Sequence, residues 1–199
     1  LHLSLRRQRQ MCIRDRTSEP PEEVKKNFSK VFEELRVDIP SYGQPRGLSL
    51  QKENVMSLSQ ASQKDMIDSF ESVILQRQCD NRDRIKPSAY MGVVSDSTPH
   101  LLAYTGTIDE NGMTNVGSAA LEYKFDFFEY VPSGTHLKTK SGVQSMSNKT
   151  FVWKHWIFNV ETGKPVAIAS AVAVTMDLKA RKSIPIPPEM AEALTKLIS

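Results

Sequence analysis

One long apolar stretch, surrounded by strand-like segments, constrains the fold more than any other feature of this sequence. It runs from Asn81 to Thr105, begins with polar residues, passes Pro87 and then becomes mostly apolar. Its apolar residues recur at the spacing of a helix with one buried side, and they include Tyr90, Val93, Val94 and Leu101. We therefore predict a long, largely buried helix that starts near Pro87.

Strand-like segments flank this helix on both sides. One precedes it, at about residues 67–78, and is rich in apolar and β-branched residues. The segments that follow it lie near residues 115–130, 135–146, 150–160 and 166–177. Short turns separate these later segments, so neighbours should pair antiparallel. A single long helix in a chain of strands predicts an α+β domain in which the sheet wraps around the helix.

The last strand shows which face should meet the helix. Along it, bulky residues alternate with small ones: Val166, Ile168, Val172 and Val174 with Ala167, Ala169, Ala171 and Ala173. Side chains alternate between the two faces of a strand, so the alanine face is nearly flat. A flat face lets a large neighbour approach closely, and we predict that this neighbour is the long helix.

Asp96 is the acid inside the apolar part of the predicted helix. It lies either on the exposed edge of the helix or in the wall of a cleft. Pro99 follows three residues later and cannot donate to the carbonyl of Ser95, so a kink or an interruption is expected there.

Composition excludes several classes of function. Residues 1–16 hold five of the 26 Lys and Arg and one of the 23 Asp and Glu, which leaves 21 basic against 22 acidic residues. The rest of the chain therefore has no basic stripe for nucleic acid. No apolar run approaches the roughly 20 residues of a membrane helix. Cys12, Cys79 and the scattered histidines form no disulfide framework or metal site, so we expect no metal and no cofactor.

The chain is expected to hold one main domain with extensions. Residues 1–16 resemble a translated sequencing adapter, although an Arg-rich mitochondrial presequence is the alternative. The predicted divisions are a non-native or disordered tail (1–20), a helix over Pro21–Leu35 with an irregular connection (21–62), the main domain (63–187) and a C-terminal helix (188–199). A cytoplasmic protein is expected, or a mitochondrial one if the basic end is a presequence.

The order of elements over residues 67–187 resembles the hot-dog fold of acyl-CoA thioesterases and dehydratases. The phenylacetate-type thioesterases of this fold carry the pattern Asn-x-x-Gly-x-x-His-Gly-Gly, followed by an acid in the helix. In the same register Asn81 matches the asparagine and Asp96 matches the catalytic acid. The departures are Arg84 for the glycine, Pro87 for the histidine, and Ser88 and Ala89 for the glycine pair.

This resemblance implies a thioester hydrolase that acts on acyl-CoA or an acyl-carrier-protein. Asp96 would activate water as a general base or attack the carbonyl directly. Asn81 would orient the water or the carboxylate, and the N–H of Ser88 would polarise the thioester carbonyl. The candidate substrate-binding residues are Ala89, Tyr90, Ser118, Lys149, Arg181 and Lys182, the last three as contacts for CoA phosphates. The cleft of this fold lies between subunits, which implies a homodimer or homotetramer.

A second register resembles the 4-hydroxybenzoyl-type thioesterases, whose pattern is Asp-x-x-Gly-His-Val with a later Tyr. Here Asp80 takes the place of the acid and Tyr90 that of the tyrosine, with residues 83–85 in place of Gly-His-Val.

Two other functions stay open. A non-catalytic acyl-binding hot-dog protein would explain the loss of His-Gly-Gly. A dehydratase would need a histidine that the segment 81–96 lacks.

Overall fold

The structure is a computed structural model that describes residues 22, 23, 26, 27, 30, 47–49, 51 and 53–198. The chain divides into two units, residues 1–44 and 45–199. In the first unit, the described residues of the predicted helix over Pro21–Leu35 are helical. The predicted tail and most of the connection between residues 37 and 52 lie outside the described residues.

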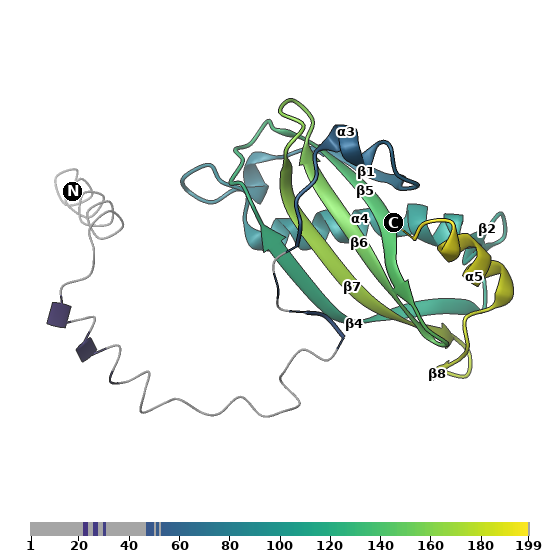
Figure 1. The fold of residues 1–199 in the computed structure, drawn as a ribbon. Coiled ribbons are helices and arrows are strands. Elements are labelled where there is room, and N and C mark those ends of the chain that lie inside the picture. Colours follow the sequence, from purple (N-terminus) through teal and green to yellow (C-terminus); the bar gives the residue numbers. More distant parts are fainter. Residues whose placement is uncertain are drawn as a thin grey trace. The chain divides into compact units, whose positions relative to one another are not determined.

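The second unit is built on a curled antiparallel sheet (Figure 1). Its strands are β1 (Ile67–Val73), β4 (Val116–Phe127), β5 (His136–Met146), β6 (Thr150–Asn159) and β7 (Pro165–Asp177), in the order β1-β5-β6-β7-β4. The short β8 (Lys182–Ser183) pairs with the end of β7, and β2 (Ile108–Asp109) and β3 (Gly112–Met113) form a separate hairpin. All the predicted strands are confirmed. The first is shorter than predicted, because its end becomes the 3₁₀ helix η2 (Gln76–Gln78).

The predicted buried helix is α4 (Pro87–Tyr104), with Pro87 at its first position. A proline fits there because the first N–H groups of a helix have no intrahelical partner. The helix is not interrupted at Pro99 but continues to Tyr104. Just before the proline, the hydroxyls of Ser97 and Thr98 donate to the carbonyls of Val93 and Val94, at 2.9 and 3.1 Å.

Two apolar clusters hold α4 against the sheet. In the first, Tyr90 and Val93 from the start of the helix pack with residues of the sheet that include Ile157 and Ala167. In the second, Leu101 packs with Phe151, Trp153, Ala171 and Ala173, and with Met190 and Leu194 of α5 (Pro188–Thr195). Alanines of β7 therefore face α4 in both clusters, as predicted.

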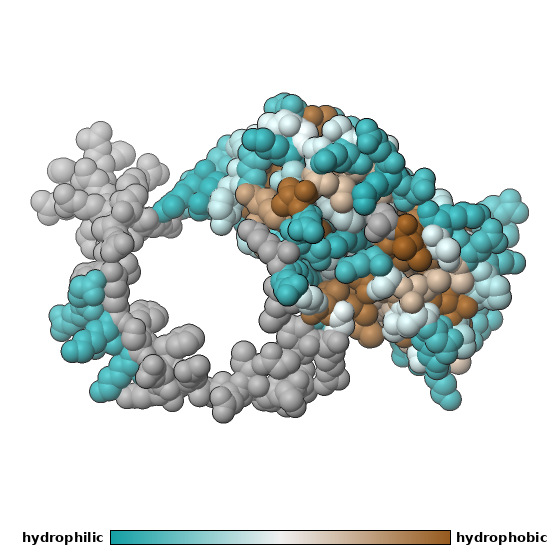
Figure 2. Space-filling model, viewed as in Figure 1, coloured by the Kyte–Doolittle hydropathy of each residue, from teal (hydrophilic) through white to brown (hydrophobic). Residues whose placement is uncertain are grey.

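The opposite face of the sheet carries the short helix α3 (Leu58–Ala61), so that the sheet lies between α3 and α4 (Figure 1). Ala61 packs there against Trp156, Phe158 and Ile168. Ser57 and Gln60 form a capping box that fixes the start of α3. Figure 2 shows apolar side chains between hydrophilic ones on this side of the molecule.

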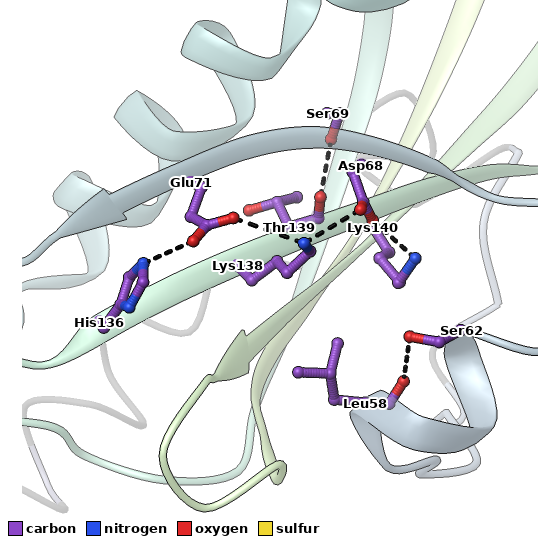
Figure 3. Close-up of polar contacts among 9 residues, drawn as sticks. All are labelled: Leu58, Ser62, Asp68, Ser69, Glu71, His136, Lys138, Thr139 and Lys140. Atoms are coloured by element: carbon purple, nitrogen blue, oxygen red, sulfur yellow. Dashed lines mark hydrogen bonds and ion pairs between the residues drawn. The ribbon is translucent and has the colours of Figure 1, made fainter.

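Ion pairs join the first strand to its neighbour on this face (Figure 3). Asp68 of β1 lies between Lys138 and Lys140 of β5, at 3.0 and 2.6 Å. Glu71 similarly lies between His136 and Lys138, at 2.8 and 3.4 Å. The lysine stems cover the sheet while their charged ends stay near carboxylates, which holds β1 in register.

Enlarging an inward alanine of β7 should destabilise the domain. Ala167 is fully buried under α4, so Ala167→Leu is expected to lower the free energy of unfolding by about 1–3 kcal/mol. The control is Val174→Leu on the opposite face, which is half-buried and should change stability by about 0.5 kcal/mol or less. Denaturant unfolding of both variants measures this; an equal effect would mean that α4 does not press on the alanine face.

Candidate active site

A cavity of about 150 Å³ lies between α4 and the sheet. Its deep wall is made of buried residues from two strands and from α4, its C-cap and α5: Val94, Leu101, Thr105, Phe151, Trp153, His155, Ala171, Ala173 and Met190. Exposed residues of α4 and β4 lie at its rim, namely Thr98, Ser118, Ala120 and Tyr123. The cavity therefore opens between α4 and the edge strand β4, and its interior is mainly apolar.

Two buried polar side chains, those of Thr105 and His155, interrupt the apolar wall. His155 of β6 is 2% exposed, and its Nδ1 lies 2.8 Å from the hydroxyl of Ser141 on β5. Ser141 in turn lies 2.6 Å from the hydroxyl of Ser69 on β1. This row of buried polar side chains crosses the sheet between the two apolar clusters that hold α4.

Burial sets the charge of this histidine. It lowers the pKa of His155 from its usual value of 6.5 to about 4, because the charged imidazolium would lose its hydration. His155 is therefore neutral near pH 7, with one protonated and one bare ring nitrogen.

Asp96 lies away from this cavity. Its side chain is exposed, in contrast to the buried Val93, Val94 and Ser97 around it. Two residues along a helix differ by about 200° in direction, which places Asp96 nearly opposite both Val94 and Thr98, its cavity-lining neighbours. Within one subunit, the structure does not bring Asp96 and the cavity together.

Asp80 has a different environment, in the loop before α4. Its carboxylate accepts hydrogen bonds from the N–H groups of Arg82 and Arg84, at 2.8 and 3.1 Å, and forms a 3.0 Å ion pair with the side chain of Arg84. The Arg82 amide contributes most to lowering the pKa of Asp80, and the contacts of Arg84 add to it while partial burial opposes them. Asp80 is thus held ionised at the entrance to the helix.

Asp83 follows in the same loop and has a backbone φ of +55°. This left-handed conformation favours glycine, and Asp83 stands where the second register expects glycine. Its carboxylate accepts hydrogen bonds from the hydroxyl and the N–H of Ser133, at 2.7 and 3.2 Å. The loop is therefore fixed to the chain beyond β4.

The other predicted residues near the helix start fall into two environments. Asn81 and Ser88 are exposed, whereas Ala89 is half-buried and donates its N–H to the carbonyl of Lys86 at 2.9 Å. Tyr90 is buried, with its ring 5.1 Å from that of Phe127, and burial raises its pKa. Ser88 is eight residues before Asp96, or about 12 Å along the helix axis. The structure brings Ser88, Ala89 and Tyr90 together but not Asp96.

The three predicted cationic residues lie at one end of the sheet. Lys149 is in the β5–β6 turn, and its Nζ lies 3.5 Å from the carbonyl of Ser183, next to Lys182. Arg181 occupies the turn between β7 and β8, with φ +53°. The carbonyl of Lys149 accepts from Thr175, which pairs with Ser118 at the cavity rim. The backbone of Lys149 therefore lies two strand positions away from that of Ser118, with Thr175 between them.

Two features are absent from the part of the chain that the structure describes, a group of metal-binding side chains and a helix that could span a membrane. Residues 53–198 and the few described before them contain no group of three or more His, Cys, Asp or Glu side chains that can hold a metal. Within those same residues, no helix has the length and apolar character of a membrane span.

Neither the cavity nor His155 was singled out by the sequence patterns. The available signal was the alternation along β6. Trp153 and His155 are two residues apart, so they share a face, and the antiparallel pairing places that face over the alanines of β7.

A family model supplies independent evidence. The model of the thioesterase-like superfamily matches residues 75–194, more than half of the chain. This range includes the Asp80 loop, α4 and strands β4 to β7. None of the curated proteins matches the sequence.

Solved structures match at low identity. The PA5185 protein from Pseudomonas aeruginosa is 18% identical with a TM-score of 0.57, over 65% of this chain and 90% of its own. A 1,4-dihydroxy-2-naphthoyl-CoA thioesterase from Synechocystis is 16% identical with a TM-score of 0.54, over 64% and 95%. A Staphylococcus aureus protein solved in complex with CoA is 11% identical with a TM-score of 0.60, over 74% and 90%. These similarities confirm the hot-dog fold.

The buried histidine should make stability depend on pH. Because the pKa of His155 is lower in the folded chain than in the unfolded one, its contribution is complete above about pH 6.5 and is lost as the pH falls towards 4. The loss should reach about 3 kcal/mol. His155→Leu should remove this slope, whereas His100→Leu, an exposed histidine, should keep it. Denaturant unfolding at pH 4–8 tests this, and equal slopes in wild type and His155→Leu would contradict it.

Proposed function

Because the chain belongs to the thioesterase-like superfamily, we propose that it hydrolyses thioesters of CoA or of an acyl-carrier-protein. The observation that carries this proposal is the mainly apolar cavity that opens between α4 and the edge strand. An apolar pocket with a few polar groups suits an acyl group, whose thioester end would remain near the rim.

The basic end of the sheet supports a phosphate-bearing carrier. Lys149, Arg181 and Lys182 are exposed, and Lys149 connects through Thr175 to the rim residue Ser118. Cationic side chains at this position can meet the phosphates of CoA or of a phosphopantetheine arm. The Staphylococcus aureus protein of similar fold was solved with CoA, which is consistent with this assignment.

The reaction requires a carboxylate near the thioester carbonyl. Water attacks the carbonyl carbon, the C–S bond breaks, and the departing sulfur takes the proton that water gives up. A carboxylate either accepts that proton first or attacks the carbon itself and is then released by water. Asp80 and Asp96 are the candidates for this role.

The geometry favours Asp80 over Asp96. Neither carboxylate lines the cavity within one subunit. Asp80 lies in the loop that leads into α4, whose positive end can stabilise a developing oxyanion, and the left-handed backbone of Asp83 fits the second register. The lowered pKa of Asp80 makes it a weak base, which favours direct attack or orientation of water. Asp96 would serve only a substrate bound against the exposed flank of α4, with Asn81 and Ser88 in separate positions.

Parallel variants test the assignment. Asp80→Asn keeps an oxygen that can accept from Arg82, so it should fold, and it is expected to lower kcat by at least about 100-fold. Asp96→Asn should retain activity. Thiol release from a panel of short, long and aryl acyl-CoAs measures both. The reverse result would assign Asp96, and no hydrolysis by folded wild type would favour a non-catalytic acyl-binding protein.

The open edge of β4 supports a dimer. Within the described residues β4 pairs only with β7, and its free edge carries exposed apolar side chains such as Leu121, which is 62% exposed. An uncovered apolar edge strand invites pairing with another strand, here the β4 of a second copy. Such a dimer would bring two subunits together at the cavity rim.

A charge on this edge should separate the subunits. Leu121→Lys places like charges near each other across the strand pair, and it is expected to convert a dimer into monomers. The control is Val55→Lys, since Val55 is similarly exposed at 56% but lies before α3. Size-exclusion chromatography with light scattering gives the masses. A dimer that survives Leu121→Lys would exclude this edge as the interface.

A further inference from the structure

Three polar contacts link Thr139, Ser69, Ser141 and His155, and only one arrangement of the protons makes all three of them hydrogen bonds. A carbonyl oxygen can only accept, so Ser69 donates its single hydroxyl proton to the carbonyl of Thr139, at 3.3 Å. The 2.6 Å contact between the two serines must then be a donation from Ser141 to Ser69. Ser141 has no further proton to give, so Nδ1 of His155 donates to it at 2.8 Å.

This series of hydrogen bonds leaves Nε2 of His155 unprotonated, so that it can accept a hydrogen bond. The neutral ring, protonated on Nδ1, presents a lone pair at Nε2, and no described residue donates to that atom. Buried polar groups normally have a hydrogen-bond partner. Because the ring lines the cavity, a molecule bound there can supply the donor to Nε2.

The rest of the wall limits what that molecule can be. Beside the imidazole the deep wall is formed by apolar side chains such as Phe151 and Trp153, and by Thr105, whose hydroxyl donates to the carbonyl of Leu101 at 2.9 Å. An engineered apolar cavity of about 150 Å³ binds benzene, so this one has room for an acyl group of about six heavy atoms. A carboxylate or ketone at the same place would point an oxygen lone pair at the lone pair of Nε2, and the two would repel each other. A hydroxyl would instead donate a hydrogen bond to Nε2.

We propose that the cavity selects acyl groups of about this size that carry a hydroxyl, and that Nε2 of His155 accepts the hydrogen bond from it. The proposal rests on the proposed thioesterase function and names its substrate class. His155 is then a specificity-determining residue, and Ser141 and Ser69 are positioning residues that fix its tautomer. The carboxylate that attacks the thioester lies elsewhere and is not part of this selection.

The tautomer can be measured without any substitution or substrate. In wild-type protein labelled with ¹⁵N-histidine, NMR at pH 7 should show a His155 ring protonated on Nδ1 and bare on Nε2, identified by the signal that His155→Leu removes. Ser141→Ala deletes the acceptor that fixes this tautomer and should raise the fraction protonated on Nε2. A wild-type ring protonated on Nε2 would overturn the proposal.

Small probes of matched size test recognition directly. Phenol should bind wild type about 3- to 10-fold more tightly than benzene, the ratio expected from one hydrogen bond, and it should shift the Nε2 resonance of His155. His155→Leu should bind both probes about equally, with unfolding curves confirming that it folds. Equal binding of the two probes by wild type, or phenol binding without a shift at Nε2, would contradict the proposal.

Rates of thioester hydrolysis then distinguish a failure of this specificity proposal from a failure of the proposed thioesterase function. Hydroxyacyl-CoAs and their deoxy counterparts, such as 3-hydroxybutyryl-CoA and butyryl-CoA, should differ in kcat/KM by about the same 3- to 10-fold, and the difference should vanish in His155→Leu. Hydrolysis without this preference would reject the specificity but keep the thioesterase. Phenol selectivity without hydrolysis of any thioester would reject the thioesterase but keep the acceptor site.

Discussion

The close approach of α4 to the alanine face of β7 is the contact on which the rest of the structure depends. Small side chains at Ala167, Ala171 and Ala173 let the helix lie near the sheet, and Val93 and Leu101 fill the space on either side of the middle. Between these clusters the sheet carries His155 and Ser141 in place of large apolar residues. The cavity exists because small residues and an imidazole leave the middle of the interface incompletely filled.

The same curl of the sheet decides where the cavity opens. Within the described residues β1 and β4 are the two edge strands of the sheet, and each pairs with one neighbour, β1 with β5 and β4 with β7. The rim of the cavity lies at the open side of β4, between α4 and Ser118. A second subunit paired along β4 would therefore cover the open edge and border the cavity rim at once.

Much of the fold could be predicted because its signals are local. Alternation along β7 and the i, i+3, i+4 pattern of α4 depend on neighbours in sequence, and both led to the correct elements and the correct facing sides. The site could not be predicted in the same way. The environment of Asp80 depends on hydrogen bonds from Arg82 and Arg84, and the acceptor character of His155 depends on residues of two other strands. Asp96 drew attention as an acid in an apolar segment, yet its exposure follows from helix geometry.

Asp80 and His155 both have lowered pKa values, and they have different proposed roles: Asp80 takes part in the reaction, and His155 selects the acyl group. Asp80 is ionised because backbone N–H groups donate to it, whereas His155 is neutral because burial excludes its charge, with a pKa of about 4. Between about pH 5 and pH 9 neither group changes its protonation state. An anionic carboxylate at the helix start and a neutral acceptor on the cavity wall thus coexist over the whole physiological range. Among the hydrogen bonds of the described residues, none joins the loop of Asp80 to the strands that fix the tautomer of His155. A substitution that changes the reaction can therefore leave the selection of the acyl group intact.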